Sequence, residues 1–576
     1  MPTITISKID LETLLSQKLS IIEIEALLPL VKGEIKEIKE DKLILELADT
    51  NRPDLLSVEG IARQINTKDK RDYSNIFKQK GKLEIIVDPE LLKIRPYIGG
   101  FIVKGITLTE ALLGAIIETQ EKLADGFGHK RKNIAIGIYN AEKLQFPIYY
   151  RAVLPTEKTF VPLGAEEELN LQEILDTHHK GKEYRYILEE VQPQEVQPQE
   201  VQPQEANKFP FLEDSNGTPL SFPPIINSRA TGEVKPGDNQ LFCEVTGTDI
   251  EQLISIVNIL AANFLDRGQV ENPVGNPVGN PAAGGAAGGA ASGTDIYPCT
   301  IKYPYPTQLG KTVITPYDFS FALDIKDEEF ERVLGKKITT MEIRERLESY
   351  GYKIDQQPKK LERSGNSAMA EHGPKNLIRV LVPSYRRDIM HPVDIIEDFA
   401  ISVGLEKFEP APLEEFTMGK PASTQPIIDK IREIMIGCGF EETMSNILTS
   451  ENSLLTNLRL LNDINAPNEL NDIKPVVIEN PISDSYAVLR NSIIPSLLSI
   501  EAQSSKATYP HRIFEVGEIV IQDSKAENKS RTKNRLAAII AHPTSNFSEL
   551  HSFLDTLMYY LGVRYEFKKI VHPSFI

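Results

Sequence analysis

The chain has 576 residues and a formal net charge of -18 at pH 7. This length predicts several domains with separate hydrophobic cores, and the negative charge argues against a protein that coats nucleic acid non-specifically, without excluding a local basic patch. No apolar run approaches the ~20 residues that span a bilayer, and the first residues do not resemble a signal peptide. Cys243, Cys299 and Cys438 stand far apart, which fits a reducing cytoplasm and no disulfide framework.

Residues 1–90 are predicted to form a small α/β structural domain. Residues 3–7 alternate like a strand, Ser20 and Glu23 make a capping box, and residues 34–47 read as a hairpin. A polar turn at Asn51–Asp54 then leads into a further helix, whose backbone donors these side chains can satisfy.

Residues 91–270 are predicted to form a larger α/β domain, with a helix over residues 109–123. Lys130, Arg131 and Lys132 belong to the densest basic cluster of the chain, directly before an apolar strand. This cluster could bind the phosphates of a nucleic acid, and a solvated loop is the alternative that the residues leave open.

Four polar residues of this domain are candidates for a binding or hydrolytic site. Asn227 and Ser228 follow a Pro-Pro-Ile-Ile segment, and Glu244 and Thr246 precede Asp249, the expected N-cap of a helix over residues 250–265. No Ser-His-Asp relay accompanies them, so hydrolysis would depend on positioned water. Ordinary turn and strand positions are the structural alternative.

Two low-complexity segments interrupt the chain. Residues 191–205 repeat Val-Gln-Pro-Gln-Glu three times and are read as an insertion, and residues 271–297 are rich in glycine and alanine and are read as a flexible linker. Neither segment offers enough apolar surface to order itself, so we expect no catalytic role for either.

Residues 298–409 are predicted to form a winged-helix-like domain of two short helices followed by strands, with residues 361–375 as a polar loop. The helices are more acidic than basic, which favours packing over groove binding. At the end of this domain, Asp394, Glu397 and Asp398 share a helix face, and Asp388 lies just upstream. Four converging carboxylates would suit Mg²⁺, although acidic residues also favour a helix N-terminus without any metal.

Several of these segments resemble the beta subunit of phenylalanyl-tRNA synthetase in its shorter, archaeal and eukaryotic form. The resemblance rests on Pro383–Asp388 with His391–Asp398, on Asn51–Asp54, and on the short sequence motifs around Asn227 and Glu244. It implies an α/β and α+β multidomain fold, in which residues 91–270 form an editing and tRNA-binding domain. Residues 410–576 would form a class II synthetase-like domain with an antiparallel sheet.

The resemblance also implies a function, an ion and partners. Two alpha and two beta chains would form a heterotetramer in the cytoplasm, where the alpha chain joins phenylalanine to tRNA(Phe) with ATP and Mg²⁺. This chain would bind tRNA(Phe) through Lys130, Arg131 and Lys132. It would hydrolyse mischarged tyrosyl-tRNA(Phe) through Asn227, Ser228, Glu244 and Thr246, and it would hold Mg²⁺ through Asp388, Asp394, Glu397 and Asp398.

Two features depart from an active class II domain. A glycine-rich arginine motif is absent, so we expect Arg490 and Glu515 to support the fold and an interface rather than catalysis. The sequence also ends in what resembles the middle of a domain, which suggests a truncated sequence. A stand-alone deacylase of mischarged tRNA and a non-catalytic RNA-binding scaffold are the alternative functions.

Overall fold

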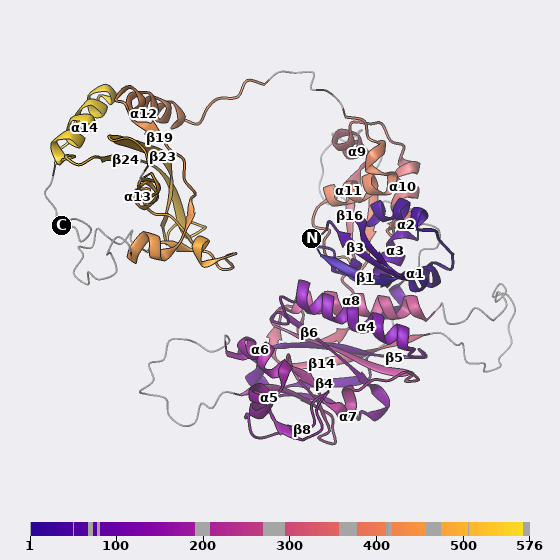
Figure 1. Cartoon of the computed structure of the whole chain (residues 1–576). Coiled ribbons are helices and arrows are strands. Elements are labelled where there is room, and N and C mark those ends of the chain that lie inside the picture. The colour runs from indigo at the N-terminus through magenta and orange to yellow at the C-terminus, as the bar shows by residue number, and fades with distance from the viewer. Residues whose placement is uncertain are drawn as a thin grey trace, which may run out of the picture. The chain divides into compact units, whose positions relative to one another are not determined.

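The computed structural model in Figure 1 divides into two units, Met1–Pro410 and Ala411–Ile576, which are described separately. The structure describes residues 2–49, 51–66, 73–77, 81–189, 208–268, 294–355, 377–410, 412, 417–456, 474–504 and 506–567. The predicted insertion at 191–205, most of the predicted linker at 271–297, and the predicted loop at 361–375 lie outside these residues.

The N-terminal part of the first unit is a three-stranded antiparallel sheet in the order β1-β3-β2, covered by short helices. The predicted strand, hairpin and capping box at Ser20 and Glu23 are confirmed. Alternate residues of the central strand (Leu43, Leu45 and Leu47) are fully buried, as a half-covered sheet requires. The elements are β1 (Thr3–Ser7), α1 (Lys8–Leu15), α2 (Ile21–Leu27), β2 (Gly33–Lys39), β3 (Lys42–Leu47) and α3 (Val58–Ile65).

A ten-stranded sheet forms the largest layer, in the order β12-β11-β10-β7-β4-β14-β5-β13-β6, with β15 paired to β14. Figure 1 shows helices α4 and α8 lying together along this sheet. The strands are β4 (Leu83–Val87), β5 (Tyr97–Lys104), β6 (Ile134–Asn140), β7 (Ile148–Val153), β10 (Phe209–Glu213), β11 (Pro219–Phe222), β12 (Ile226–Asn227), β13 (Gln240–Gly247), β14 (Asp295–Thr307) and β15 (Gly310–Thr315).

Helices and two short strands accompany the ten-stranded sheet. The predicted helix over residues 109–123 and the predicted cap at Asp249 are confirmed. The side chains of Thr109 and Asp249 accept hydrogen bonds from the first turns of α4 and α8. Almost every residue of α8 is buried, so it is a core helix rather than a surface one. The elements are α4 (Glu110–Lys122), β8 (Thr159–Phe160), β9 (Leu169–Asn170), α5 (Leu171–Thr177), α6 (His179–Glu189), α7 (Arg229–Gly232) and α8 (Ile250–Arg267).

The sheet order moves two expected domain boundaries. Strand β4 was placed in the N-terminal domain and β15 in the winged-helix-like domain, but both belong to the ten-stranded sheet. The reason is non-local pairing: β14 binds β4 in parallel on one side and β5 in antiparallel on the other. The third sheet therefore begins only at Phe321.

The last part of the first unit combines a three-stranded sheet, in the order β16-β18-β17, with three helices. It has a hydrophobic core of its own, in which the rings of Phe330 and Phe399 pack edge to face with centroids 5.3 Å apart. Pro392 begins α11 and Gly404 follows its end, as predicted. The elements are β16 (Phe321–Lys326), α9 (Asp327–Leu334), α10 (Thr340–Ser349), β17 (Lys353–Asp355), β18 (Leu377–Val382) and α11 (Pro392–Val403).

The second unit is built on a long antiparallel pair, β23 with β24, to which β19 adds in parallel. A second small antiparallel sheet has the order β20-β22-β21. No helix in the described part of the chain is both long and apolar enough to cross a membrane. The elements are α12 (Gln425–Gly437), β19 (Glu441–Glu442), β20 (Leu448–Thr449), β21 (Val476–Val477), β22 (Val488–Leu489), α13 (Ile494–Gln503), β23 (His511–Gln522), β24 (Ser530–Ala541) and α14 (Phe547–Leu561).

Candidate functional site

A cavity of about 240 Å³ is lined by residues of both edge strands of the ten-stranded sheet, β6 and β12. Its walls are mostly apolar and come from β6 and from the turn between β11 and β12. Such a mainly apolar cavity with a few converging polar groups is the usual form of a small-ligand site. The polar side chains that line it are Gln120, Arg131, His179, Lys180, Ser221, Asn227 and Glu244.

Glu244 is the most unusual of these groups. It lies on β13 and is only 3% exposed. The hydroxyl of Tyr139 donates a hydrogen bond to its Oε1 at 3.0 Å, whereas its Oε2 has no partner among the described residues. A buried carboxyl oxygen without a partner is costly, so beside a cavity it is a group that a bound ligand or a water can satisfy.

Burial also changes the protonation of this carboxyl group. Loss of hydration raises the pKa of Glu244 from 4.5 to about 8, against the smaller lowering effects of the Tyr139 hydrogen bond and the Arg95 charge. Glu244 is therefore mainly neutral at pH 7. In the neutral state the Oε2 hydroxyl can donate a hydrogen bond to a ligand. After ionisation the same oxygen can accept one.

The cavity brings together only two of the four residues predicted for the hydrolytic site. Asn227 and Glu244 both line it. Ser228 instead caps α7, because its Oγ accepts a hydrogen bond from the backbone N–H of Ala230. Thr246 is fully buried beneath the sheet surface, where its Oγ1 accepts a hydrogen bond from Arg95.

Of the three basic residues predicted to bind tRNA, only Arg131 lines the cavity. Arg131 leans over the cavity, where its guanidinium lies 4.4 Å above the ring of Tyr184 and donates to the backbone oxygen of Ile225. Lys130 and Lys132 are exposed beside it. Lys130 and Arg131 both have positive φ, a conformation that non-glycine residues seldom adopt and that occurs disproportionately at binding sites.

Sequence reasoning missed Tyr139, Ser221 and Gln120. Tyr139 lies on a strand of seven buried residues, where a tyrosine looks like ordinary core. The only available signal was Gly137 in the same apolar strand, since glycine inside a strand marks a close approach. That approach is to Tyr139 and Glu244 themselves.

The four acids predicted to bind magnesium do not form one cluster. Arg386 binds Asp388 through two hydrogen bonds, at 2.7 and 2.6 Å, and Asp398 through a third at 2.8 Å. Tyr352 donates another hydrogen bond to Asp398. Arg386 is 3% exposed, so the two carboxylates are neutralised by a buried guanidinium in the place expected for an ion.

The other two acids lie on the surface with different partners. Asp394 accepts hydrogen bonds from the backbone N–H groups of Met390 and His391, as the acidic member of a capping box. Glu397 pairs with Lys32 at 2.6 Å. Within the described ranges no group of three or more metal-binding side chains is arranged around one point, so the four do not fit a single magnesium ion as they stand.

The Arg386 pairs continue into the N-terminal domain. Arg52 binds Asp54 through two hydrogen bonds, at 2.9 and 2.8 Å, and its Nε lies 3.9 Å from Asp388. Burial opposes ionisation, but the charges of Arg52 and Arg386 outweigh it and lower the pKa of Asp54. The predicted Asn51–Asp54 turn is thus a buried joint between two domains of the first unit.

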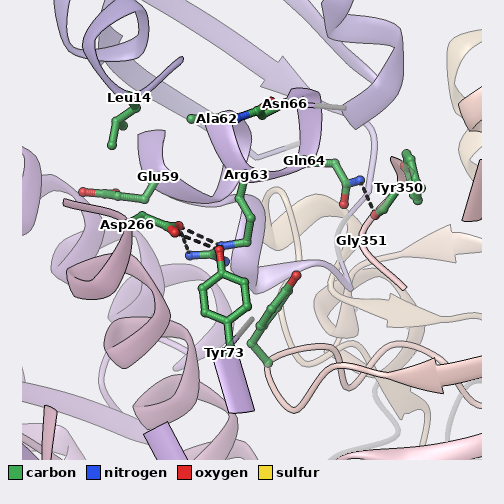
Figure 2. Close-up of a pocket in the computed structure, with 11 residues that line it drawn as sticks. Leu14, Glu59, Ala62, Arg63, Gln64, Asn66, Tyr73, Asp266, Tyr350 and Gly351 are labelled. Carbon is green, nitrogen blue, oxygen red and sulfur yellow. Dashed lines mark hydrogen bonds and ion pairs between the residues drawn. The ribbon is translucent and has the colours of Figure 1, made fainter. Parts of the chain in front are cut away.

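Figure 2 shows a second cavity next to this joint, around Arg63. Its volume is only about 30 Å³, enough for ordered water rather than a substrate. Arg63 donates to Tyr73 and Asp266, and its guanidinium lies 4.7 Å from the ring of Tyr385. We read this region as a packed contact between α3, α8 and the segment that follows β18.

Two families of known proteins match the chain. Residues 323–405 match the tRNA synthetase B5 domain, and residues 410–576 match the phenylalanyl tRNA synthetase beta chain CLM domain. The sheet and helices of the last part of the first unit coincide with the first match, and the second unit coincides with the second. Together the domains define a chain of the tRNA synthetase class.

Whole-chain relatives narrow the class. A phenylalanine–tRNA ligase beta subunit from Borrelia hermsii is 31% identical over all of this chain and 92% of its own length. The beta subunit from Thermococcus gammatolerans is 34% identical over all of this chain and 91% of its own length. An N-terminal fragment of the Pyrococcus horikoshii beta subunit has 31% identity and a TM-score of 0.57, and it covers 70% of this chain and all of the fragment. The chain belongs to the phenylalanyl-tRNA synthetase beta subunit family.

Proposed function

We propose that this chain works in the cytoplasm with an alpha subunit, as two alpha and two beta chains, and that it removes tyrosine wrongly joined to tRNA(Phe). In this assignment the alpha chain attaches phenylalanine to tRNA(Phe) with ATP and Mg²⁺. The observation that carries the hydrolytic role is the buried, unpartnered Oε2 of Glu244 beside the cavity.

The second unit supports a partner-dependent role. Arg490 is only 1% exposed, and it is held by Glu515 at 2.7 Å and by Ser445 at 2.7 Å. An arginine bound in this way cannot reach the phosphate of ATP, so this unit is not expected to activate an amino acid by itself. Its surface also carries many exposed apolar side chains, which suit contact with another chain. Among them are Met418, Met444, Ile482, Phe547 and Tyr559.

The cavity explains how tyrosine could be separated from phenylalanine. A 4-hydroxyphenyl side chain would place its hydroxyl against Glu244, with the amide of Asn227 nearby, while its ring packs on the apolar walls. Phenylalanine would leave the buried carboxyl unpaired, at a cost of about 1–3 kcal/mol for that group alone. Sites that bind a substrate hydroxyl in this way discriminate strongly against analogues that lack it.

The basic side chains around the cavity could bind the phosphates at the aminoacylated end of the tRNA. Arg131, His179 and Lys180 line the cavity. Exposed Lys130 and Lys132 extend this positive region and would contact the tRNA backbone. The lining side chains include no Ser-His-Asp relay, so the ester would be attacked by a water held between these groups and the substrate.

A deacylation assay tests this function. The reconstituted complex is given tyrosyl-tRNA(Phe) and phenylalanyl-tRNA(Phe), and release of each amino acid is followed. We expect rapid hydrolysis of the tyrosyl ester alone, with Glu244→Ala and Asn227→Ala slowing it at unchanged aminoacylation. Thr246→Val tests the buried threonine, which should act only through Arg95. Absence of tyrosyl-tRNA hydrolysis by the intact complex would leave a scaffold role, and hydrolysis by the isolated chain would favour a stand-alone deacylase.

We further propose that magnesium at α11 uses the surface acids rather than all four. Asp394 and Glu397 remain accessible, and Mg²⁺ retains several waters, so two carboxylates with ligands from a partner chain would suffice. Calorimetric titration of the complex with Mg²⁺ should show weaker binding for Asp394→Asn and Glu397→Gln. If Asp388→Asn weakens binding equally while the melting temperature stays unchanged, all four acids act together and this proposal is wrong.

A further inference from the structure

The side chain of Tyr139 is buried behind Glu244, one of the residues that line the cavity. It is 0% exposed, and its ring stacks on Phe242 with centroids 5.9 Å apart and an angle of 29°. The hydroxyl lies 3.0 Å from Oε1 of Glu244 and 3.4 Å from Oδ1 of Asn227. Since 3.4 Å exceeds the usual length of a hydroxyl hydrogen bond, the proton of Tyr139 goes to Glu244.

The backbone of β6 reserves space for this hydrogen bond. Gly137 stands opposite Glu244 in the pairing of β6 with β13. A Cβ atom on Gly137 would lie 2.3 Å from the Tyr139 hydroxyl and 2.5 Å from Oε1 of Glu244. Any side chain at this position would therefore push the two hydrogen-bonded groups apart.

The protonation of Tyr139 and Glu244 gives the two carboxyl oxygens of Glu244 different roles. Burial, reinforced by the neighbouring Glu244, raises the pKa of Tyr139 well above its usual value, so the phenol stays a donor. Oε1 of Glu244 accepts this bond, which leaves Oε2 to carry the proton when the carboxyl is neutral. The charged or titratable groups that surround the carboxyl are Tyr139, Tyr150, Cys243 and Arg95, with Arg131, His179 and Lys180 across the cavity.

We propose that Tyr139 is a positioning residue that occupies Oε1 of Glu244 and thereby presents Oε2 to the hydroxyl of a bound 4-hydroxyphenyl side chain. This inference rests on the proposed function for the identity of the ligand. It concerns selectivity between ligands, however, which binding measures without any hydrolysis. Tyr139 has no contact with the reacting ester in this arrangement.

The test compares two tyrosine variants in the intact complex, with L-tyrosine amide and L-phenylalanine amide as probes. Tyr139→Phe removes the hydroxyl that donates to Glu244. Tyr305→Phe is the matched control, because its hydroxyl donates to the backbone oxygen of Pro96 at 2.5 Å instead of to Glu244. Binding of both probes is measured by NMR titration from pH 6 to pH 9, with the amino-acid site of the alpha chain saturated by a phenylalanyl-adenylate analogue.

We expect the wild type and Tyr305→Phe to prefer tyrosine amide, and Tyr139→Phe to lose roughly tenfold of that preference, the equivalent of one hydrogen bond. The apparent pKa of binding should rise in Tyr139→Phe and stay unchanged in Tyr305→Phe, because only the first variant loses a donor that stabilises the carboxylate. Gly137→Ala keeps the phenol but displaces the bond, so it should reproduce both effects and provides a second test should Tyr139→Phe fold poorly.

Each outcome decides between the alternatives. If Tyr139→Phe and Gly137→Ala keep the preference and the pH dependence of the wild type, the positioning role is overturned. If the wild type shows no preference, Oε2 does not meet the ligand hydroxyl, and the inference is overturned as well. A clear preference that depends on Tyr139, in a complex that hydrolyses no tyrosyl-tRNA, would refute the proposed function while supporting the positioning role.

Discussion

Replacing Arg386 with methionine should loosen the joint between the N-terminal and B5-like domains. Arg386 is the buried centre of this joint, since it makes three hydrogen bonds to two carboxylates. The side chains of Asp388 and Asp398 are each 8% exposed, so both charges would stay in the interior, with only Tyr352 bonded to Asp398 and Arg52 3.9 Å from Asp388. Breaking a buried ion pair from one side typically costs about 3–5 kcal/mol, and here two acids share the same arginine.

The neighbouring Arg387 provides a matched control. Arg387→Met makes the same chemical change one residue further on, but Arg387 pairs with Glu251, whose side chain is 54% exposed. An exposed pair of this kind contributes about 0–1 kcal/mol, and the contact of Arg387 with the ring of Phe319 adds about as much. The two variants should therefore differ by several kcal/mol although the sequence places them side by side.

Amide hydrogen exchange read by mass spectrometry suits this comparison, because it reports each domain of a multidomain chain separately. Arg386→Met should speed exchange in α3 and α11, on the two sides of the joint, whereas Arg387→Met should leave both near the wild-type rate. Equal effects of the two substitutions would refute the reasoning.

Four further expectations follow from buried groups and from the space around two glycines. Glu244→Gln should gain stability relative to the wild type as the pH rises from about 4.5 to about 8, by up to a few kcal/mol, because the folded pKa lies above the unfolded one and ionisation favours unfolding; melting temperatures across this range test it. Arg490→Met should lower the melting temperature of the second unit by removing a buried pair worth about 3–5 kcal/mol when broken, and an unchanged melting temperature would contradict this. Gly60→Ala should unfold the turn before α3, because its Cβ would lie 1.6 Å from the backbone oxygen of Asp54. Gly114→Ala meets open space inside α4 and should stabilise the chain by about 0.5–1 kcal/mol, as denaturant titration would show.

The sequence by itself determined the local structure and the family. Capping residues at Ser20 and Asp249 marked the helix starts correctly, because a cap depends on hydrogen bonds within the next few residues. The motifs around Pro392 and Asn227 were sufficient for the resemblance that the whole-chain relatives confirm. Such features are visible in sequence because their physics acts over a single turn or a short motif.

Tertiary structure alone decided which groups meet. The spacing of Asp394, Glu397 and Asp398 predicted a shared helix face. It could not show that Arg386 binds Asp398, or that Lys32, 365 residues away along the chain, binds Glu397. Strand β14 likewise joined β4 and β5 across more than 190 residues of sequence. The partner of Glu244 was hidden for the same reason: strand pairing between β6 and β13 brings Tyr139 to it, and the free energy of a buried charge depends on such distant neighbours rather than on the residues beside it.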